Sequence, residues 1–202
     1  MRLAVEHIRR MKGGSQAHLM RCDNDEYYVI KFKNNPQHLR TLANEIFATR
    51  LAALMGISVP QVDIVEVRSS LIEHTPDLMI QMRAARLPCA TGKQFGSKFP
   101  GNPSSSTIYD LIPDECFDRV HNIDDFLGIY VLDKWMCQTD KRQAIFVQQS
   151  NSGADGTSDK AYQAVMIDQG FCFNGGHWNF PDAPQPLCQL PRVPRRVGNK
   201  II

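Results

Sequence analysis

A lysine in an apolar stretch is followed further along the chain by a glutamate, and two residues of these types in this order can bind a phosphate group. Lys31 lies in the run Tyr27–Phe32, which is rich in aromatic and β-branched residues, and Glu45 lies in the middle of a predicted helix. A strand lysine that pairs with a glutamate on the next helix can hold its ammonium against nucleotide phosphates. Taken one at a time, a solvated strand lysine and a surface glutamate are the alternative.

Two aspartates in the second half of the chain stand at the ends of predicted elements. Asp140 follows a predicted helix and precedes two basic residues and Gln143, and Asp168 ends an apolar run and is followed by Gln169 and Gly170. An aspartate in a loop can accept the proton of a substrate hydroxyl, with a nearby amide as a ligand for Mg²⁺. An aspartate at a strand end is a typical Mg²⁺ ligand. A solvated turn at Asp140 and a hairpin turn at Asp168 are the alternatives.

The segment Gly13-Gly14-Ser15 lies between two predicted strands. Glycines let the backbone approach a phosphate closely and present N–H groups to it, although a tight hairpin turn needs the same residues. The segment matches neither a Walker loop nor a G-x-G-x-x-G fingerprint, so it is a weak signal alone. The order of all the signals (glycine loop, strand lysine, helix glutamate, loop aspartate with an amide, strand-end aspartate) is that of protein kinases.

The first ~85 residues predict the order β-β-β-α-β-β, beginning with an antiparallel meander. The helix should begin with Asn34 or Asn35 as its cap and Pro36 in its first turn, and it should end at Gly56. Its apolar residues at helical spacing are Leu39, Leu42, Ala43, Ile46, Leu51 and Leu54. The predicted strands cover 5–10, 17–22, 27–32, 62–67 and 78–82.

The second half predicts one helix and one hairpin. Residues 92–106 are rich in glycine, proline and serine, which favours a loop or a linker between lobes. The runs 144–147 and 164–167 could pair as a hairpin around the polar loop 148–160. A helix is predicted from about Asp124 to Cys137, and its apolar side should hold Phe126, Leu127, Tyr130, Val131 and Trp135.

Composition sets broad limits on the partners of this chain of 202 residues. With 43% hydrophobic residues, 22% charged residues and a net charge of +2, the core should bind neither nucleic acid nor a membrane surface strongly. The six cysteines form no C-x-x-C pair, the histidines have no metal-binding spacing and no G-x-S-x-G is present. No signal peptide or membrane span is recognisable, so a soluble cytoplasmic protein is expected.

Long segments of the chain resemble the HipA-like kinase domain family. They are GGSQAHLMRC, YYVIKFKNNPQ, LANEIFATRLAALMGISVP, FGSKFPG, DKWMCQTDKRQAIF and MIDQGFCFNGGHWNFPDAP. The resemblance implies an α+β, two-lobed protein-kinase-like fold with ATP in the cleft. The N-lobe (1–85) would be an antiparallel sheet with one helix, and the C-lobe (86–180) would be mostly helical and incomplete. The Pro/Arg-rich tail (181–202) is expected to be poorly ordered.

The resemblance also implies a role for each residue that matches the family pattern. Gly13, Gly14 and Ser15 would cover the ATP phosphates. Lys31 would contact them, with Glu45 as its helix partner, Asp140 as the catalytic base, Asp168 as the metal ligand and Gln143 as a second Mg²⁺ ligand.

Three features depart from the family. Gln138 stands where an asparagine is expected, which could alter how the catalytic loop is braced. Ile145 occupies the position five residues after Asp140, where HipA proteins have an asparagine. The resemblance fades after about Pro184, which suggests a truncated or frame-shifted end.

The function predicted from these patterns is ATP- and Mg²⁺-dependent phosphoryl transfer to a hydroxyl, foremost a serine or threonine of a protein. A small molecule or a lipid headgroup is a further possible acceptor, and HipA relatives suggest an antitoxin-like partner. Because of the departures, the alternative is a catalytically inactive nucleotide-binding or interaction module.

Overall fold

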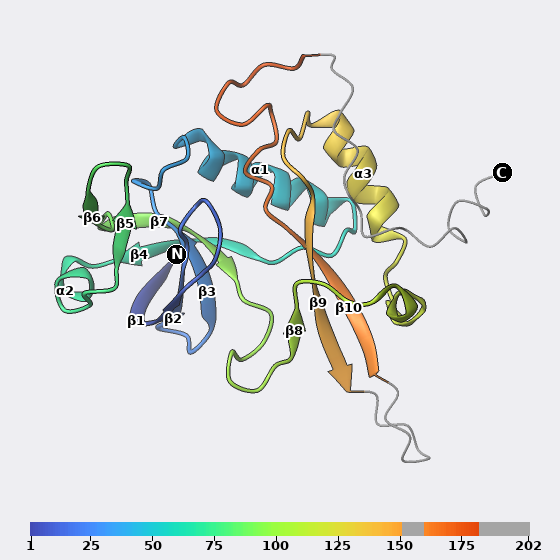
Figure 1. Ribbon diagram of the computed structural model, residues 1–202, viewed down its shortest axis with the longest axis horizontal. Helices are drawn as coiled ribbons and strands as arrows, with labels where there is room; N and C mark the ends of the chain where they lie inside the picture. The colour runs from blue at the N-terminus through green and yellow to red at the C-terminus, as the bar shows by residue number, and fades with distance from the viewer. Residues whose placement is uncertain (151–159, 182–202) are drawn as a thin grey trace.

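The chain has an α+β fold in the computed structural model, which describes residues 1–150 and 160–181. A five-stranded barrel forms one part, a three-stranded sheet with helix α3 forms the other, and α1 lies between them (Figure 1). The polar segment 151–159 and the predicted tail from residue 182 onward lie outside the described residues. Within the described part, no helix has the length and apolar content needed to cross a membrane.

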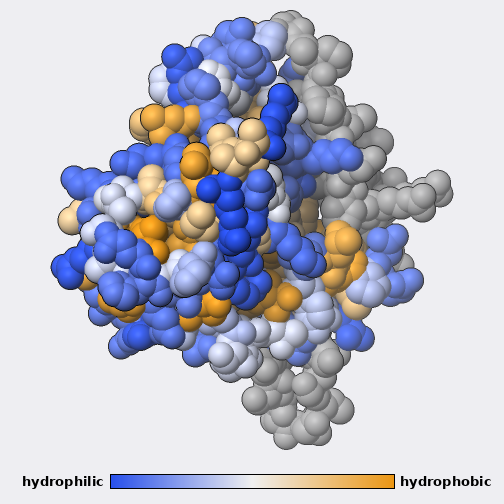
Figure 2. Space-filling view, turned by 60° about the vertical axis from the view of Figure 1, so that its left-hand side comes forward, coloured by the Kyte–Doolittle hydropathy of each residue, from blue (hydrophilic) through white to orange (hydrophobic). Residues whose placement is uncertain are grey.

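The barrel confirms the predicted meander. Strands β1, β2 and β3 pair antiparallel in sequence, β7 pairs with β3 and β4, and a short parallel contact between β1 and β4 closes the ring. Apolar side chains form its core, and the side of the molecule seen in Figure 2 carries hydrophilic residues interrupted by apolar patches. The barrel strands are β1 (Arg2–Arg10), β2 (His18–Cys22), β3 (Tyr27–Lys31), β4 (Val62–Val67) and β7 (Gly92–Lys98).

The predicted loop at 92–106 is wrong in its first half, because residues 92–98 form the strand β7. Two residues of this strand have packing roles that its composition does not reveal. A Cβ on Gly96 would lie 2.4 Å from Cγ2 of Val65, so only glycine fits this close approach. Gln94 is 1% exposed, and its Oε1 accepts a hydrogen bond from the Lys33 N–H. The first sheet therefore continues beyond residue 85.

Smaller elements flank the barrel. The predicted strand at 78–82 is shorter than expected and pairs with β6 in a separate two-stranded sheet instead of joining the barrel. These elements are α2 (Ser69–Glu73), β5 (Met79–Gln81) and β6 (Arg86–Pro88).

Helix α1 (Arg40–Leu54) begins later than predicted. Asn35 forms a turn before the helix, where its Oδ1 accepts the Gln37 N–H at 2.7 Å, so it does not cap the helix. The end is as predicted, with Gly56 at φ +79°. The predicted apolar face is partly wrong, because Leu54 is 85% exposed. The buried face instead holds Thr41, Leu42, Asn44, Glu45, Ala48, Thr49 and Ala52.

The second part confirms the predicted helix and hairpin but not a mostly helical lobe. Its described residues form one α-helix, one 3-10 helix and three strands, and β9 and β10 pair antiparallel over their whole length. These elements are β8 (Ile108–Tyr109), the 3-10 helix Asp114–Arg119, α3 (Asp125–Trp135), β9 (Gln143–Ser150) and β10 (Lys160–Ile167).

The predicted apolar side of α3 is partly wrong. Phe126 is buried as predicted, but Tyr130, Val131 and Trp135 are exposed, and the helix buries Ile129, Leu132 and Asp133 in their place. This buried face joins an apolar cluster with Phe146 of β9, Met166 of β10 and the two alanines Ala48 and Ala52 of α1. Helix α1 therefore packs into the core of the second part while it follows directly from the barrel.

A pair of histidines lies in the first two barrel strands. His18 is fully buried against Phe32, and its Nδ1 lies 3.0 Å from Nε2 of His7. The Nε2 of His18 has no hydrogen-bond partner among the described residues. Burial, with His7 adding to it, lowers the pKa of His18 to about 4. The native protein therefore holds this histidine neutral.

We expect acid to destabilise the protein through His18. Between pH 6.5 and 5 the unfolded chain binds a proton that the native state does not, so stability falls by up to about 2 kcal/mol as the pH drops. Urea unfolding at pH 7.5 and pH 5 should show a smaller pH-dependent loss in His18→Gln than in the wild type. The exposed His121→Gln should behave as the wild type, and the same pH dependence in all three proteins would contradict this role for His18.

Candidate active site

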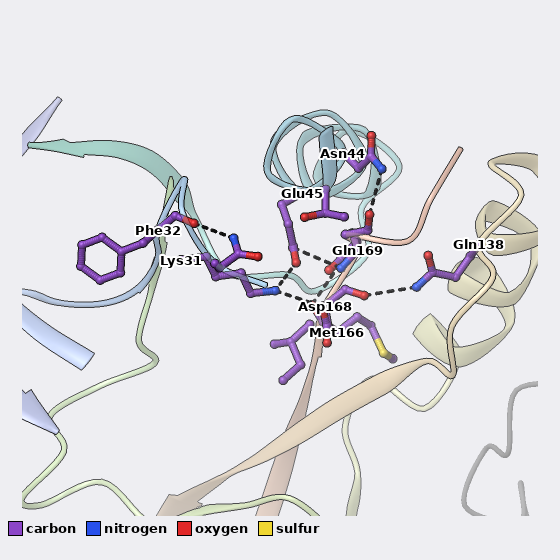
Figure 3. Close-up of polar contacts among 12 residues, drawn as sticks. Lys31, Phe32, Asn44, Glu45, Gln138, Met166, Asp168 and Gln169 are labelled. Carbon is purple, nitrogen blue, oxygen red and sulfur yellow. Dashed lines mark hydrogen bonds and ion pairs between the residues drawn. The ribbon is translucent and has the colours of Figure 1, made fainter. Parts of the chain in front are cut away.

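Lys31 lies between two carboxylates that come from distant parts of the chain. Its Nζ pairs with Oε1 of Glu45 on α1 and lies 3.0 Å from Oδ1 of Asp168, which follows β10 (Figure 3). The exposed fractions of the three side chains are 12% for Lys31, 4% for Glu45 and 28% for Asp168. The structure thus brings together three of the predicted site residues, and the solvated-lysine alternative is wrong.

The ammonium of Lys31 and the carboxylate of Asp168 stabilise each other's charge, whereas burial, with Asp168 adding to it, raises the pKa of Glu45. Burial alone would lower the pKa of Lys31, but the carboxylates of Glu45 and Asp168 more than offset it and raise that pKa above its ordinary value. Burial also opposes the ionisation of Asp168, but the nearby charge of Lys31 outweighs this effect and holds the pKa of Asp168 below its usual range. The ammonium is therefore permanently charged, and it faces carboxylates that a cationic ligand could compete for.

The backbone at Asp168 is bent away from the strand direction. Asp168 has φ +63°, a left-handed conformation that aspartate tolerates better than most residues. The Gln138 Nε2 donates to its carbonyl oxygen at 3.2 Å (Figure 3). Gln138, which departs from the family pattern, thus braces the residue that follows β10.

Gln143 and Asp140 belong to the start of β9 and to the turn before it. Gln143 begins β9 and is the register partner of Ile167, so it stands beside the residue that precedes Asp168. Asp140 is exposed in the turn before β9, and its neighbour Thr139 donates its N–H to Phe171 O at 3.2 Å. The turn is therefore tied to the segment after Asp168, but within the described part of the chain no hydrogen bond or ion pair joins Asp140 to Lys31.

The glycine loop joins β1 to β2 at the end of the barrel where β3 reaches Lys31, because His18 is the register partner of Ile30. The loop is a tight hairpin connection, in which the Gln16 N–H donates to Gly13 O at 3.2 Å. A Cβ on Gly14 would lie 3.6 Å from the Gln37 side chain, in the segment before α1. Contact of Gly13, Gly14 and Ser15 with phosphate stays a prediction.

A buried ion pair that the sequence patterns did not indicate lies next to the site. It joins Arg142 to Asp133 and contacts the residue before Asp168. Arg142 is buried, its Nε donates to Oδ2 of Asp133 at 2.9 Å and its Nη2 to Oδ1, and its Nη1 donates to the carbonyl oxygen of Ile167 at 2.9 Å. The pair links α3 to the last residue of β10. The correct helical phase of α3 could have found it, because Asp133 lies four residues after the buried Ile129.

The oxygen donors present are suitable for Mg²⁺. This hard cation keeps several waters and takes one or two carboxylates plus substrate phosphates, so it needs no all-protein cage. Asp168 offers a carboxylate and Gln143 an amide oxygen from the neighbouring strand. No cluster of three or more His, Cys, Asp or Glu residues that could hold a metal occurs in residues 1–150 and 160–181.

Comparison with protein families identifies the chain. The family model for the HipA-like kinase matches residues 4–175, which include every predicted site residue. The chain belongs to the HipA-like kinase family. No curated protein matches this chain.

Two solved structures of the Golgi casein kinase are similar to this HipA-like kinase chain. One has Mn/ADP bound, with 12% sequence identity, and the other has 13%, each at a TM-score of 0.49. The matches cover 85% and 87% of this chain, which spans slightly more than half of the two matched chains (55% and 56%). At such low identity no residue role is transferred from either structure.

Removing one member of the buried ion pair should strongly destabilise the protein. Asp133→Ala leaves the Arg142 guanidinium buried without its carboxylate, and we expect it to lower the free energy of unfolding by about 3–5 kcal/mol. Urea unfolding should show a much smaller loss for Glu6→Ala, which breaks a partly exposed pair with Arg21. Equal losses in the two variants would show that Arg142 does not depend on Asp133.

Proposed function

We propose that this HipA-like kinase transfers a phosphoryl group from ATP to a hydroxyl, foremost that of a serine or threonine in a protein. The observation that carries the proposal is the buried contact of Lys31 with both Glu45 and Asp168, which lie far apart in sequence. A structural ion pair needs one carboxylate. Two carboxylates around one ammonium suit a site where nucleotide phosphates and a metal ion take over part of these contacts.

Each residue near this contact would have a separate task. Glu45 orients the Lys31 ammonium toward the phosphates, and the glycine loop covers them with backbone N–H groups. Asp140 accepts the proton of the acceptor hydroxyl, and its exposure suits contact with a second substrate. Asp168 and Gln143 hold Mg²⁺, which when bound neutralises charge on the phosphates. Catalysis then rests mainly on positioning and electrostatic stabilisation.

The proposed cleft lies between two lobes. We propose that the N-lobe includes β7 and reaches Lys98 instead of residue 85, because β7 is a full member of the barrel. The C-lobe would then hold α3 and the β8–β9–β10 sheet, with Asp140, Gln143 and Asp168 at its edge. A cytoplasmic location stays a prediction from the sequence pattern, and an antitoxin-like partner stays a prediction from the family resemblance.

A catalytically inactive nucleotide-binding module is the second candidate. Ile145, at the position where HipA proteins have an asparagine, favours it, because isoleucine offers no ligand atom to a metal. In that case Mg²⁺-ATP would bind without transfer of its phosphate. A small-molecule or lipid-headgroup acceptor would leave the proposed chemistry unchanged.

Mg²⁺-ATP should raise the melting temperature of the wild type. Saturation at 100 times the Kd stabilises the native state by about 2.7 kcal/mol. Asp168→Asn should reduce the Mg²⁺-dependent part of this shift, because one carboxylate ligand is lost. The exposed Asp110→Asn is the matched control and should keep the full shift. A wild type that melts cooperatively with no nucleotide-dependent shift would overturn nucleotide binding at this site.

Asp140→Asn should abolish phosphate transfer while keeping the ATP-dependent melting shift. Transfer of radiolabelled phosphate from ATP, to the protein itself and to a peptide library, measures the reaction. Unchanged transfer in this variant would remove Asp140 from the role of base. Nucleotide binding without transfer in the wild type would favour the inactive module.

A further inference from the structure

Asn44, the neighbour of Glu45 on α1, contacts the segment that follows Asp168 at several points. Its side chain is fully buried, and its Nδ2 lies 2.8 Å from each of three carbonyl oxygens. These oxygens belong to Gly170, Cys172 and Gly175 (Figure 3 shows Asn44 directed at this segment). One side chain thus gathers three carbonyls of a single turn-rich segment.

Only one orientation of the Asn44 amide satisfies its surroundings. The NH₂ group is a pure donor and faces the three acceptors, and Oδ1 accepts the Trp178 Nε1–H at 2.9 Å. The reversed amide would place Oδ1 against the three carbonyl oxygens and Nδ2 against an indole donor. The contacts therefore select asparagine over aspartate at this position.

Neighbouring residues of α1 contact the same segment. Oε2 of Glu45 accepts the Gln169 N–H at 3.1 Å. Arg40, one turn earlier, donates to Gly176 O at 2.9 Å, and its guanidinium lies 4.9 Å from the centre of the Trp178 ring. A Cβ on Gly176 would lie 2.8 Å from the His38 ring, so the segment approaches the start of the helix closely.

We propose that Asn44 is a positioning residue that holds the segment 169–178 against α1, so that Glu45 and Asp168 both face Lys31. The effect of this positioning on nucleotide binding rests on the proposed function, but the contacts of Asn44 themselves do not depend on a nucleotide. If the segment leaves α1, Glu45 loses the Gln169 N–H and Asp168 is free to turn away. Both carboxylate partners of the ammonium then lose their fixed positions.

The contacts of Asn44 with the segment 169–178, called the clamp below, are tested by two variants. A third variant is the control. Asn44→Asp keeps the shape of the side chain but turns a carboxylate oxygen toward three carbonyls. Trp178→Phe removes the donor to Oδ1 of Asn44 and keeps a smaller aromatic ring beside Arg40. The control is Asn122→Asp, since Asn122 likewise bonds backbone groups, with Ala164 O at 2.8 Å and Ala164 N at 2.9 Å.

Hydrogen exchange measured by mass spectrometry on the full chain without nucleotide is the first readout. We expect amides of residues 169–175 to exchange about tenfold faster in Asn44→Asp, since local opening follows the loss of buried hydrogen bonds. Trp178→Phe should give a smaller acceleration in the same segment. Asn122→Asp should leave this segment unchanged, and unaltered exchange in both clamp variants would overturn the proposal.

Labelling of Lys31 by an amine-reactive ester separates positioning from general stability. We expect several-fold faster labelling of Lys31 in both clamp variants than in the wild type or in Asn122→Asp, with the exposed Lys33 as an internal reference. A faster exchange of 169–175 without faster labelling of Lys31 would show that the segment does not control the ammonium, which also overturns the proposal.

The affinity for Mg²⁺-ATP links the clamp to the proposed function. We expect a Kd at least tenfold higher in Asn44→Asp and an unchanged Kd in Asn122→Asp. An unchanged Kd in Asn44→Asp, despite altered exchange and labelling, would overturn the catalytic meaning of the clamp. A wild type that does not bind Mg²⁺-ATP would refute the proposed function, while exchange and labelling still decide whether Asn44 positions Lys31.

Discussion

The buried ammonium of Lys31 is the constraint on which the rest of the site depends. A charge removed from water is tolerated only where opposite charges and hydrogen bonds replace its hydration. Glu45 and Asp168 supply these, and they belong to α1 and to the segment after β10. The barrel, the helix and the second sheet must therefore meet at one point, and a shift of any of them would leave a charge without its partner.

Helix α1 satisfies this constraint because one face of it serves two purposes. Its middle turn directs Asn44 and Glu45 at the segment that follows Asp168, and its later turns bury Ala48 and Ala52 in the apolar cluster of the second part. Displacing the helix would expose apolar surface and unpaired polar groups together. The position of Glu45 thus depends on the packing of Ala48 and Ala52 in this apolar cluster.

Local patterns in the sequence determined most of the elements and the central residues of the site. The aromatic and β-branched run around Lys31, the helix that carries Glu45 and the hairpin that ends at Asp168 are signals within a few residues, so periodicity and turn residues reveal them. The order of these residues along the chain predicts a kinase-like site. The family match agrees with a kinase-like chain, and the roles of the single residues stay predictions.

Only the tertiary structure decided which polar residues are buried and at which glycines another side chain approaches the backbone closely. Gly92–Lys98 resembles a loop in composition, yet it is a barrel strand because Gly96 makes room for a side chain of β4. Arg142 and Asn44 resemble solvated residues, yet partners distant in sequence enclose them. The cost of burying a polar group depends on whether a partner lies at hydrogen-bonding distance, and that distance is set by the packing of the whole chain.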